Sequence, residues 1–237
     1  MAKQKIDKDR KIFEDVFDSL TVRTLEKLKS KKHFAAISGI IKSGKEGQVF
    51  NAIQDDDTQV AVKIYMIETS SFQNMQDYIK GDRRFFSIGK NKKKLVYAWC
   101  AKEYRNLKKA YEVGVSVPNP IAFLGNILIM ELVSDNGQPA KHLAKTELDN
   151  PKQMFDMVLS EMKKFYFDAG LVHADLSEFN IIVRDGKPII IDVGQSVLLN
   201  HPMAKQFQRR DVENIVNFFN KHKLDIDSEE ILNEFEK

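Results

Sequence analysis

Two short segments predict both a local fold and a chemistry for this chain: Leu171-Val172-His173-Ala174-Asp175-Leu176-Ser177-Glu178-Phe179-Asn180 and Ile189-Ile190-Ile191-Asp192-Val193-Gly194. They supply an Asp, an Asn and a second Asp in an order that suits metal-assisted phosphoryl transfer. One carboxylate can orient a hydroxyl nucleophile, while the amide and the other carboxylate hold Mg²⁺ on the phosphates of a nucleotide. The alternative is that three polar residues merely end strands in a solvated loop.

A hairpin between the two segments would bring these polar residues together. Ile181–Val183 and Ile189–Ile191 are short β-branched runs. Asp185-Gly186 between them is a dipeptide that favours a two-residue turn with positive φ. Counting outward from that turn places Asn180 and Asp192 at the open end of the hairpin, beside the loop that carries the first Asp.

The composition favours a globular chain without a membrane span. The sequence has 237 residues, of which 43% are apolar, so a sizeable core can form. No apolar run reaches the roughly 18 residues of a spanning helix, and the charged N-terminus differs from a secretory signal. The single cysteine, Cys100, excludes an internal disulfide and fits a reducing compartment. We therefore expect no membrane partner and a cytoplasmic location.

The basic residues are unevenly distributed along the chain. The net charge is only +3, which by itself does not indicate a nucleic-acid partner. Lysine and arginine nevertheless gather in residues 1–33 and 80–109, and the second segment has few acidic residues. Two such patches can meet RNA phosphates. A solvated basic surface and a groove that faces a nucleotide are the alternatives.

Hydrophobic spacing predicts the elements of the first half. Residues 9–30 carry apolar side chains at helical spacing, and a second helix is predicted over Ala101–Val113, ended by Gly114. Strands are predicted at 40–41, 48–53, 59–64, 121–123 and 127–130. Residues 68–94 show only weak periodicity, so we interpret them as a long mobile insertion with short helical parts.

The second half is predicted to be mainly helical. Residues 131–138 resemble a linker with a turn at 135–137. A helix follows over 154–169, with Gly170 as its C-cap, and further helices are predicted over 209–220 and 227–236. Because strands end near Val133 and helices follow, the fold class is α+β, with a β-rich lobe, a helical lobe, a hinge and a cleft between the lobes.

Two features of the first half suit phosphate binding. Ser43-Gly44-Lys45-Glu46-Gly47-Gln48-Val49 joins two predicted strands, and its small residues let backbone N–H groups approach phosphate oxygens, although a plain hairpin turn has the same pattern. Val60-Ala61-Val62-Lys63 places a Lys at the end of an apolar strand, where burial requires a partner. We predict Glu103 as that partner; a solvent-facing Lys on an edge strand is the alternative.

Together these motifs resemble the RIO kinases, an atypical branch of the protein-kinase-like superfamily. The segments that carry the resemblance, several of them typical of the Rio1 branch, are Ser43–Glu46, Gly81–Phe85, His173–Asn180, Ile191–Ser196 and Arg209–Ile215. The resemblance covers most of the chain and implies a single RIO kinase domain over 1–237. Its parts would be a helical extension at 1–33, an N-lobe at 34–133 with the flexible loop 68–94, and a C-lobe at 134–237.

The resemblance also implies ATP and Mg²⁺ or Mn²⁺ as cofactors and assigns roles to residues. Asp175 would be the catalytic Asp, and Lys63 would hold phosphates and pair with Glu103. Asn180 and Asp192 would bind the metal, and Asp192 is a candidate for transient phosphorylation. The implied nucleotide-binding residues are Ser43, Gly44, Lys45, Glu46, Gly47, Val49, Ala61, Lys63, Met130, Glu131 and Val133. The candidate autophosphorylation sites are Ser70, Ser71 and Ser87.

The chain departs from the family pattern, and from ordinary kinases, in two places. Gly47 stands where Ala is commoner, which would loosen the phosphate loop. No A-P-E sequence follows Asp192, so we expect the chain to lack the peptide-docking helices of ordinary kinases. His173 is predicted to support the catalytic loop and not to act as an acid or base.

Three functions are compatible with these observations. The first is an ATP-dependent serine/threonine kinase and ATPase that autophosphorylates and acts in maturation of the small ribosomal subunit, with the pre-ribosomal subunit and its rRNA as partners. The second is an assembly factor, gated by ATP hydrolysis, that does not phosphorylate other proteins. The third is a small-molecule kinase of the aminoglycoside or choline type, which shares the spacing His173-x-Asp175-x-x-x-x-Asn180. The flanking motifs favour the first two.

Overall fold

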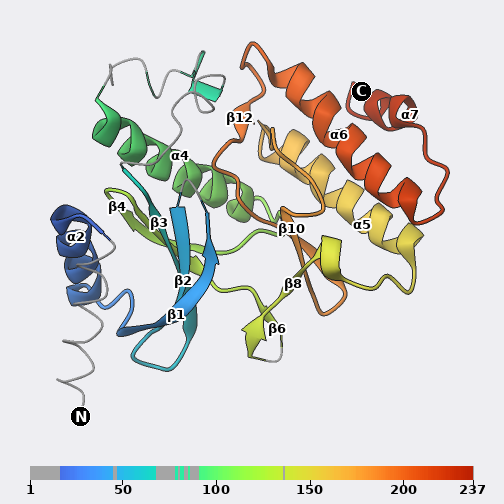
Figure 1. Ribbon diagram of the computed structural model, residues 1–237. Helices are drawn as coiled ribbons and strands as arrows, with labels where there is room; N and C mark the ends of the chain where they lie inside the picture. The colour runs from blue at the N-terminus through green and yellow to red at the C-terminus, as the bar shows by residue number, and fades with distance from the viewer. Residues whose placement is uncertain are drawn as a thin grey trace. The chain divides into compact units, whose positions relative to one another are not determined.

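The computed structural model describes residues 17–44, 47–67, 78–79, 81–82, 85, 91–135 and 137–236. The chain divides into two compact units, whose helices and strands are labelled in Figure 1. The first unit contains the N-terminal strands, and the second contains most of the helices. Helix α4 (Lys92–Glu112) contributes its first part, up to Tyr104, to the first unit and the remainder to the second.

The first unit is an antiparallel sheet in the strand order β1-β2-β3-β5-β4. Its strands are β1 (Ala36–Ser43), β2 (Gly47–Ile53), β3 (Gln59–Tyr65), β4 (Pro120–Leu124) and β5 (Ile127–Glu131). In central strand β3, Val60, Val62 and Ile64 are buried in one core with helix α2 (Ser19–Ser30). Because side chains alternate along a strand, Ala61 and Lys63 lie on the opposite face of the sheet.

The helix predicted over 9–30 begins later than expected within the described residues. Asp18 is its N-cap and accepts hydrogen bonds from the N–H groups of Leu20 and Thr21. Phe17 is therefore outside the helix, and its side chain is buried in the core. The prediction was wrong at residues 17 and 18, because a capping Asp was read as one more polar position of the helix; residues 9–16 lie outside the described residues.

The second unit combines helices with three small sheets, ordered β11-β10-β8, β12-β9 and β6-β7. Its helices are α5 (Pro151–Lys163), the π-helix η3 (Lys164–Asp168), α6 (Ala204–Lys221), α7 (Ser228–Asn233) and the 3₁₀-helix η2 (Leu143–Lys145). Its strands are β6 (Ser134–Asp135), β7 (Gln138–Pro139), β8 (Lys141–His142), β9 (Leu171–Val172), β10 (Ile181–Arg184), β11 (Lys187–Ile190) and β12 (Val197–Leu198). In Figure 1, α6 runs beside both α5 and α7.

The β10–β11 hairpin has the predicted register. Arg184 pairs with Lys187 across the turn. Asp185 and Gly186 have φ values of 52° and 71°. Positive φ at both central residues is the mark of a type I′ turn, which the Asp-Gly dipeptide favours. At the open end the N–H of Ile191 donates to the carbonyl of Asn180 at 3.0 Å, as the outward count requires.

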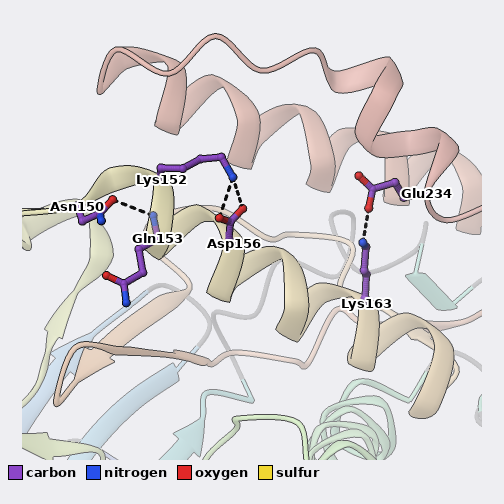
Figure 2. Close-up of polar contacts among 6 residues, drawn as sticks. All are labelled: Asn150, Lys152, Gln153, Asp156, Lys163 and Glu234. Carbon is purple, nitrogen blue, oxygen red and sulfur yellow. Dashed lines mark hydrogen bonds and ion pairs between the residues drawn. The ribbon is translucent and has the colours of Figure 1, made fainter.

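Polar contacts fix both ends of α5, as Figure 2 shows. The Oδ1 atom of Asn150 accepts a hydrogen bond from the N–H of Gln153 at 3.1 Å and caps the helix. Near its other end, Lys163 forms an ion pair with Glu234, just after α7. The predicted helix over 154–169 is thus an α-helix that continues as the π-helix η3, and Gly170 follows with positive φ, as predicted.

Other boundaries differ from the prediction. Helix α4 begins at Lys92 and not at Ala101, because Val96, Trp99 and Cys100 are buried at helical spacing behind the lysine run that was assigned to the insertion. Asn91 caps it by accepting from the N–H of Lys94 at 3.0 Å. Helix α6 begins at Ala204, five residues early, and α7 ends at Asn233. The predicted linker contains the short β6–β7 hairpin. No helix in the described ranges is long and apolar enough to cross a membrane.

Candidate active site

The structure brings Asp175 and Asn180 into direct contact. The Nδ2 atom of Asn180 donates to the backbone carbonyl of Asp175 at 2.8 Å and to its Oδ2 at 3.3 Å. A hydrogen bond of 2.9 Å from the N–H of Asn180 to the carbonyl of Ser177 closes the turn between them. The Asn180 amide is buried, whereas the Asp175 side chain is partly exposed. The loop therefore holds a carboxylate that solvent or a substrate can reach.

Asp192 lies in a strained backbone conformation next to this loop. Its φ is 60°, in the left-handed region, where a non-glycine residue costs about 1–2 kcal/mol. On one side, Nε2 of His173 is 3.0 Å from the carbonyl oxygen of Ile191. On the other side, the Nδ2 atom of Asn106 donates to the carbonyl of Val193 at 3.0 Å. The flanking peptide groups are thus fixed, while the Asp192 side chain itself is exposed.

His173 is a supporting residue of this site. Burial lowers the pKa of its imidazole to about 4, so the ring is neutral at pH 7. A neutral ring carries one N–H, and the contact with the carbonyl of Ile191 places that hydrogen on Nε2. Its Nδ1 is buried without a hydrogen-bond partner. This is a structural contact, in keeping with the expected role.

Helix α6 holds the loop 173–180, which carries the predicted catalytic residue Asp175, through residues that the sequence prediction did not single out as site residues. Asp211 accepts hydrogen bonds from the N–H groups of Ala174 at 2.8 Å and Leu176 at 2.9 Å. Arg210 donates to the carbonyl of Ala174, and Asn214 donates to the carbonyl of Leu176 at 3.0 Å. Burial raises the pKa of Asp211 to about 7, against the opposing effect of its two N–H donors and Arg210. The only sequence signal for these roles was their place in the segment 209–215.

The donor atoms of Asn180 and Asp192 fit a hard divalent cation. Because Nδ2 of Asn180 donates to Asp175, its Oδ1 is the amide atom left to bind a metal. Asp192 supplies carboxylate oxygens from an exposed side chain. Mg²⁺ and Mn²⁺ are bound through oxygen atoms, commonly one or two protein groups together with phosphates of a substrate. These two residues would hold such an ion, which would neutralise phosphate charge.

In the first unit, the structure contains the predicted Lys63–Glu103 ion pair. The Nζ atom of Lys63 is 2.8 Å from Oε1 of Glu103, and the two side chains are 13% and 1% exposed. The solvent-facing alternative for Lys63 is therefore wrong. Lys63 also lies over the ring of Tyr65, 5.0 Å from its centroid. Cys100 is buried nearby, and burial raises the pKa of its thiol to about 12 despite the charge of Lys63, so it is an unreactive thiol.

Four of the predicted nucleotide-binding residues share one face of the sheet. Val49 pairs with Lys63 across β2 and β3, and Ala61 pairs with Met130 across β3 and β5. Directly paired residues lie on the same face, and so do Ala61 and Lys63, which are two apart. The face opposite the α2 core therefore gathers Val49, Ala61, Lys63 and Met130.

The remaining predicted nucleotide contacts are only partly described. The N–H of Glu131 already donates to the carbonyl of Asn119 at 2.8 Å, so it is not available to adenine. Val133 belongs to the second unit, where its carbonyl accepts from Ala140. Lys45, Glu46, Ser70, Ser71 and Ser87 lie outside the described residues.

Strands β1 and β2 stay paired up to the described ends of the predicted phosphate loop. Ser43 pairs with Gln48, and the N–H of Gly44 donates to the carbonyl of Gly47 at 2.9 Å. A Cβ atom at Gly47 would lie 2.7 Å from the carbonyl oxygen of Ile64. This close approach of two backbones accounts for the glycine at a position where Ala was expected to be commoner.

The chain is similar to proteins of one family over most of its length. Residues 48–231 match the family model described as RIO domain. The chain is 43% identical over 221 residues to the RIO-type serine/threonine-protein kinase Rio1 of Haloferax volcanii, which covers 93% of this chain and 76% of that protein. It is 38% identical over 229 residues to the Rio1 of Methanocaldococcus jannaschii, covering 94% of this chain and 78% of that protein.

Solved structures agree on the fold. The crystal structure of a Rio2 kinase-ADP/Mg²⁺-phosphoaspartate complex from Chaetomium thermophilum matches with a TM-score of 0.69 and 26% identity, over 90% of this chain and 66% of that chain. A second Rio2 kinase structure from that organism matches with a TM-score of 0.73 and 24% identity, over 92% of this chain and 68% of that chain. The predicted α+β, protein-kinase-like fold class is therefore confirmed.

Proposed function

Since the chain belongs to the RIO family of serine/threonine-protein kinases, we propose that it transfers the γ-phosphoryl group of ATP to protein hydroxyl groups, serines of its own chain included. The observation that carries this proposal is the contact between Asn180 and Asp175. It fixes a partly exposed carboxylate beside an amide oxygen that suits a cation. The relatives named above are serine/threonine-protein kinases, so the small-molecule alternative gains no support from them.

Each residue predicted to act in the reaction would have a distinct part in it. Asp175 would accept a hydrogen bond from the attacking hydroxyl and orient it toward the γ-phosphorus. Lys63, fixed by Glu103, would neutralise charge on the α- and β-phosphates. Asn180 and Asp192 would hold Mg²⁺ or Mn²⁺. Asp192 is also the candidate for a transient aspartyl phosphate, because its side chain is exposed and because a Rio2 relative was crystallised with phosphoaspartate.

The experiment is phosphoryl transfer from labelled ATP with two matched variants. Asp175→Asn should abolish labelling of serine, because the amide accepts a proton poorly. Asp185→Asn changes a carboxylate in the turn of the adjacent hairpin and should leave labelling unchanged, since Asn-Gly also favours the type I′ turn. Equal labelling by wild type and Asp175→Asn would refute the assignment.

Treatment with hydroxylamine distinguishes phosphoserine from an aspartyl phosphate. It releases phosphate from an acyl phosphate but not from phosphoserine, so label that it removes should disappear in Asp192→Asn. Hydroxylamine-sensitive label that persists in this variant would exclude Asp192 as the acceptor.

A second candidate function is ATP-gated assembly of the small ribosomal subunit, and the first turn of α4 favours it. Lys92, Lys93 and Lys94 are exposed there, and the turn has no acidic residue. The positive charges of these lysines are repelled by the positive, N-terminal end of the helix dipole. Each lysine therefore destabilises the helix by about 0.3–1 kcal/mol when no anion is bound. Such a cluster suits a polyanion such as rRNA.

Charge reversal tests this surface without weakening the fold. Changing Lys92, Lys93 and Lys94 to Glu places acidic residues in the first turn, which should raise the melting temperature of the protein. Co-sedimentation with pre-ribosomal particles should nevertheless fall. The control reverses Lys205, Lys221 and Lys223, which are exposed on α6 and just after it. Equal co-sedimentation by both variants would remove the α4 lysines from the argument.

A further inference from the structure

Asn106 is a buried amide in α4 that holds a distant turn by both ends. Its side chain is 2% exposed. Its Nδ2 atom donates to the carbonyl of Val193 at 3.0 Å and to the carbonyl of Ser196 at 3.1 Å. A primary amide has two N–H hydrogens, which matches one hydrogen to each carbonyl. The N–H of Ser196 also donates to Val193 at 3.2 Å, so Asn106 fastens both ends of a closed turn.

This turn starts directly after Asp192. The peptide before Asp192 is held by Asn180, which accepts from the N–H of Ile191, and by His173, which contacts its carbonyl. Asn106 supplies the hold on the other side. Asp192 has φ 60°, a conformation that costs free energy for a residue with a Cβ atom, and these contacts hold the backbone on both sides of it.

We infer that Asn106 is a positioning residue for phosphoryl transfer, which acts by fixing the direction in which the Asp192 carboxylate faces. This inference rests on the proposed function of Asp192 as a metal ligand. Residues that orient a metal ligand from behind typically change metal affinity or activity by about 10–100-fold when they are replaced. If Asn106 only satisfied buried carbonyl groups, its replacement would lower the stability of the fold and leave the Mg²⁺ dependence of ADP binding unchanged.

The chain offers a matched control in Asn126. This amide is 1% exposed, and its Nδ2 donates to Tyr65 at 2.8 Å and to Thr21 at 2.9 Å, all within the first unit. Asn106→Leu and Asn126→Leu therefore both remove a buried side-chain amide whose Nδ2 atom donates two hydrogen bonds. Only the first touches the segment that follows Asp192.

The test is calorimetric binding of ADP to the full chain at increasing Mg²⁺, together with phosphoryl transfer under the same conditions. Asn106→Leu should raise the Mg²⁺ concentration for half-maximal binding at least tenfold and leave metal-free ADP binding unchanged. Asn126→Leu should reproduce the wild-type Mg²⁺ dependence, even if its melting temperature falls. If Asn106→Leu does not fold, Asn106→Ser, which keeps one donor, should give a smaller shift in the same direction.

Two failures can be told apart. If the wild type binds ADP in a Mg²⁺-dependent way and both Leu variants show the same dependence, the role of Asn106 is wrong, but the proposed function of Asp192 stands. A wild type that binds ADP without any Mg²⁺ dependence would overturn the proposed function of Asp192, and the inference with it.

Discussion

Exchange of one oxygen for nitrogen at Asp211 should loosen the catalytic loop. The two carboxylate oxygens accept from different N–H groups, Oδ2 from Ala174 and Oδ1 from Leu176. Asn has a single amide oxygen, so Asp211→Asn can keep only one of these bonds. Its NH₂ group would face the other N–H, and that donor would be buried without a partner, because Asp211 is only 3% exposed.

The size of the effect follows from that unpaired donor. A buried donor that loses its acceptor costs about 1–3 kcal/mol. Taking about 2 kcal/mol, the opening equilibrium of the loop should rise about thirtyfold. Hydrogen exchange of the Ala174 and Leu176 amides measures this equilibrium, and their protection should fall by that factor. Serine labelling should fall as well, since Asp175 lies between the two amides.

Asp18→Asn is the control, because Asp18 also accepts two backbone N–H groups but does so with one oxygen. Oδ1 takes the N–H groups of Leu20 and Thr21, both at 3.0 Å. Asn retains that oxygen and is an equally good N-cap. Protection of the Leu20 and Thr21 amides should therefore be unchanged, while the Thr21 hydroxyl, which donates to Oδ2 of Asp18 at 2.6 Å, meets an NH₂ group instead. Wild-type protection of Ala174 and Leu176 in Asp211→Asn would refute the reasoning that the loop depends on both carboxylate oxygens.

Three further changes test the supports of the two units. Burial lowers the pKa of His173 from about 6.5 in the unfolded chain to about 4 in the folded protein. The free energy of unfolding of the wild type should therefore fall by up to about 3 kcal/mol as the pH falls from about 6.5 to about 4. Urea titrations at each pH should show a smaller fall for His173→Gln. Glu103→Gln leaves the mostly buried Lys63 ammonium without a carboxylate, so the free energy of unfolding measured with denaturant should fall by about 3 kcal/mol. A fall of less than about 1 kcal/mol would mean that water solvates the lysine. Asn150→Ala removes the cap that Figure 2 shows on Gln153 and should cost about 1 kcal/mol, seen as a lower melting temperature, while an unchanged value would show that the helix end is capped by water.

The sequence predicted those parts of the site that depend on local pattern. The register of the β10–β11 hairpin follows from a two-residue turn and strand periodicity, and these place Asn180 opposite Ile191. The partner of Lys63 was predicted from the kinase pattern in which a strand Lys pairs with a helix Glu, since Glu103 lies on the predicted Ala101–Val113 helix. Both inferences use spacing that the chain displays over a few residues, or chemistry that permits few choices.

The supports of the site could not be found in this way. Asp211 is 37 residues from Ala174, and Asn106 is 87 residues from Val193. Both bind backbone atoms, so nothing in the identity of their partners points back to them. A buried polar residue on an amphipathic helix looks, in the sequence, like one more surface position. The start of α4 was missed for a related reason, because its lysines concealed the buried Val96 and Trp99.

The conformation of the catalytic loop therefore depends on the helix packed behind it more than on its own sequence. Ala174 has φ 68°, which costs about 1–2 kcal/mol for a residue with a Cβ atom. Its methyl group is fully buried beside Phe207 of α6, and burial of one such group returns about 0.8 kcal/mol. The rest is offset by Asp211 and Arg210, which bind the N–H and the carbonyl of Ala174. Phe207, Arg210 and Asp211 all lie near the start of α6, so a small displacement of that helix would remove the packing and both hydrogen bonds at once. The backbone next to Asp175 would then relax.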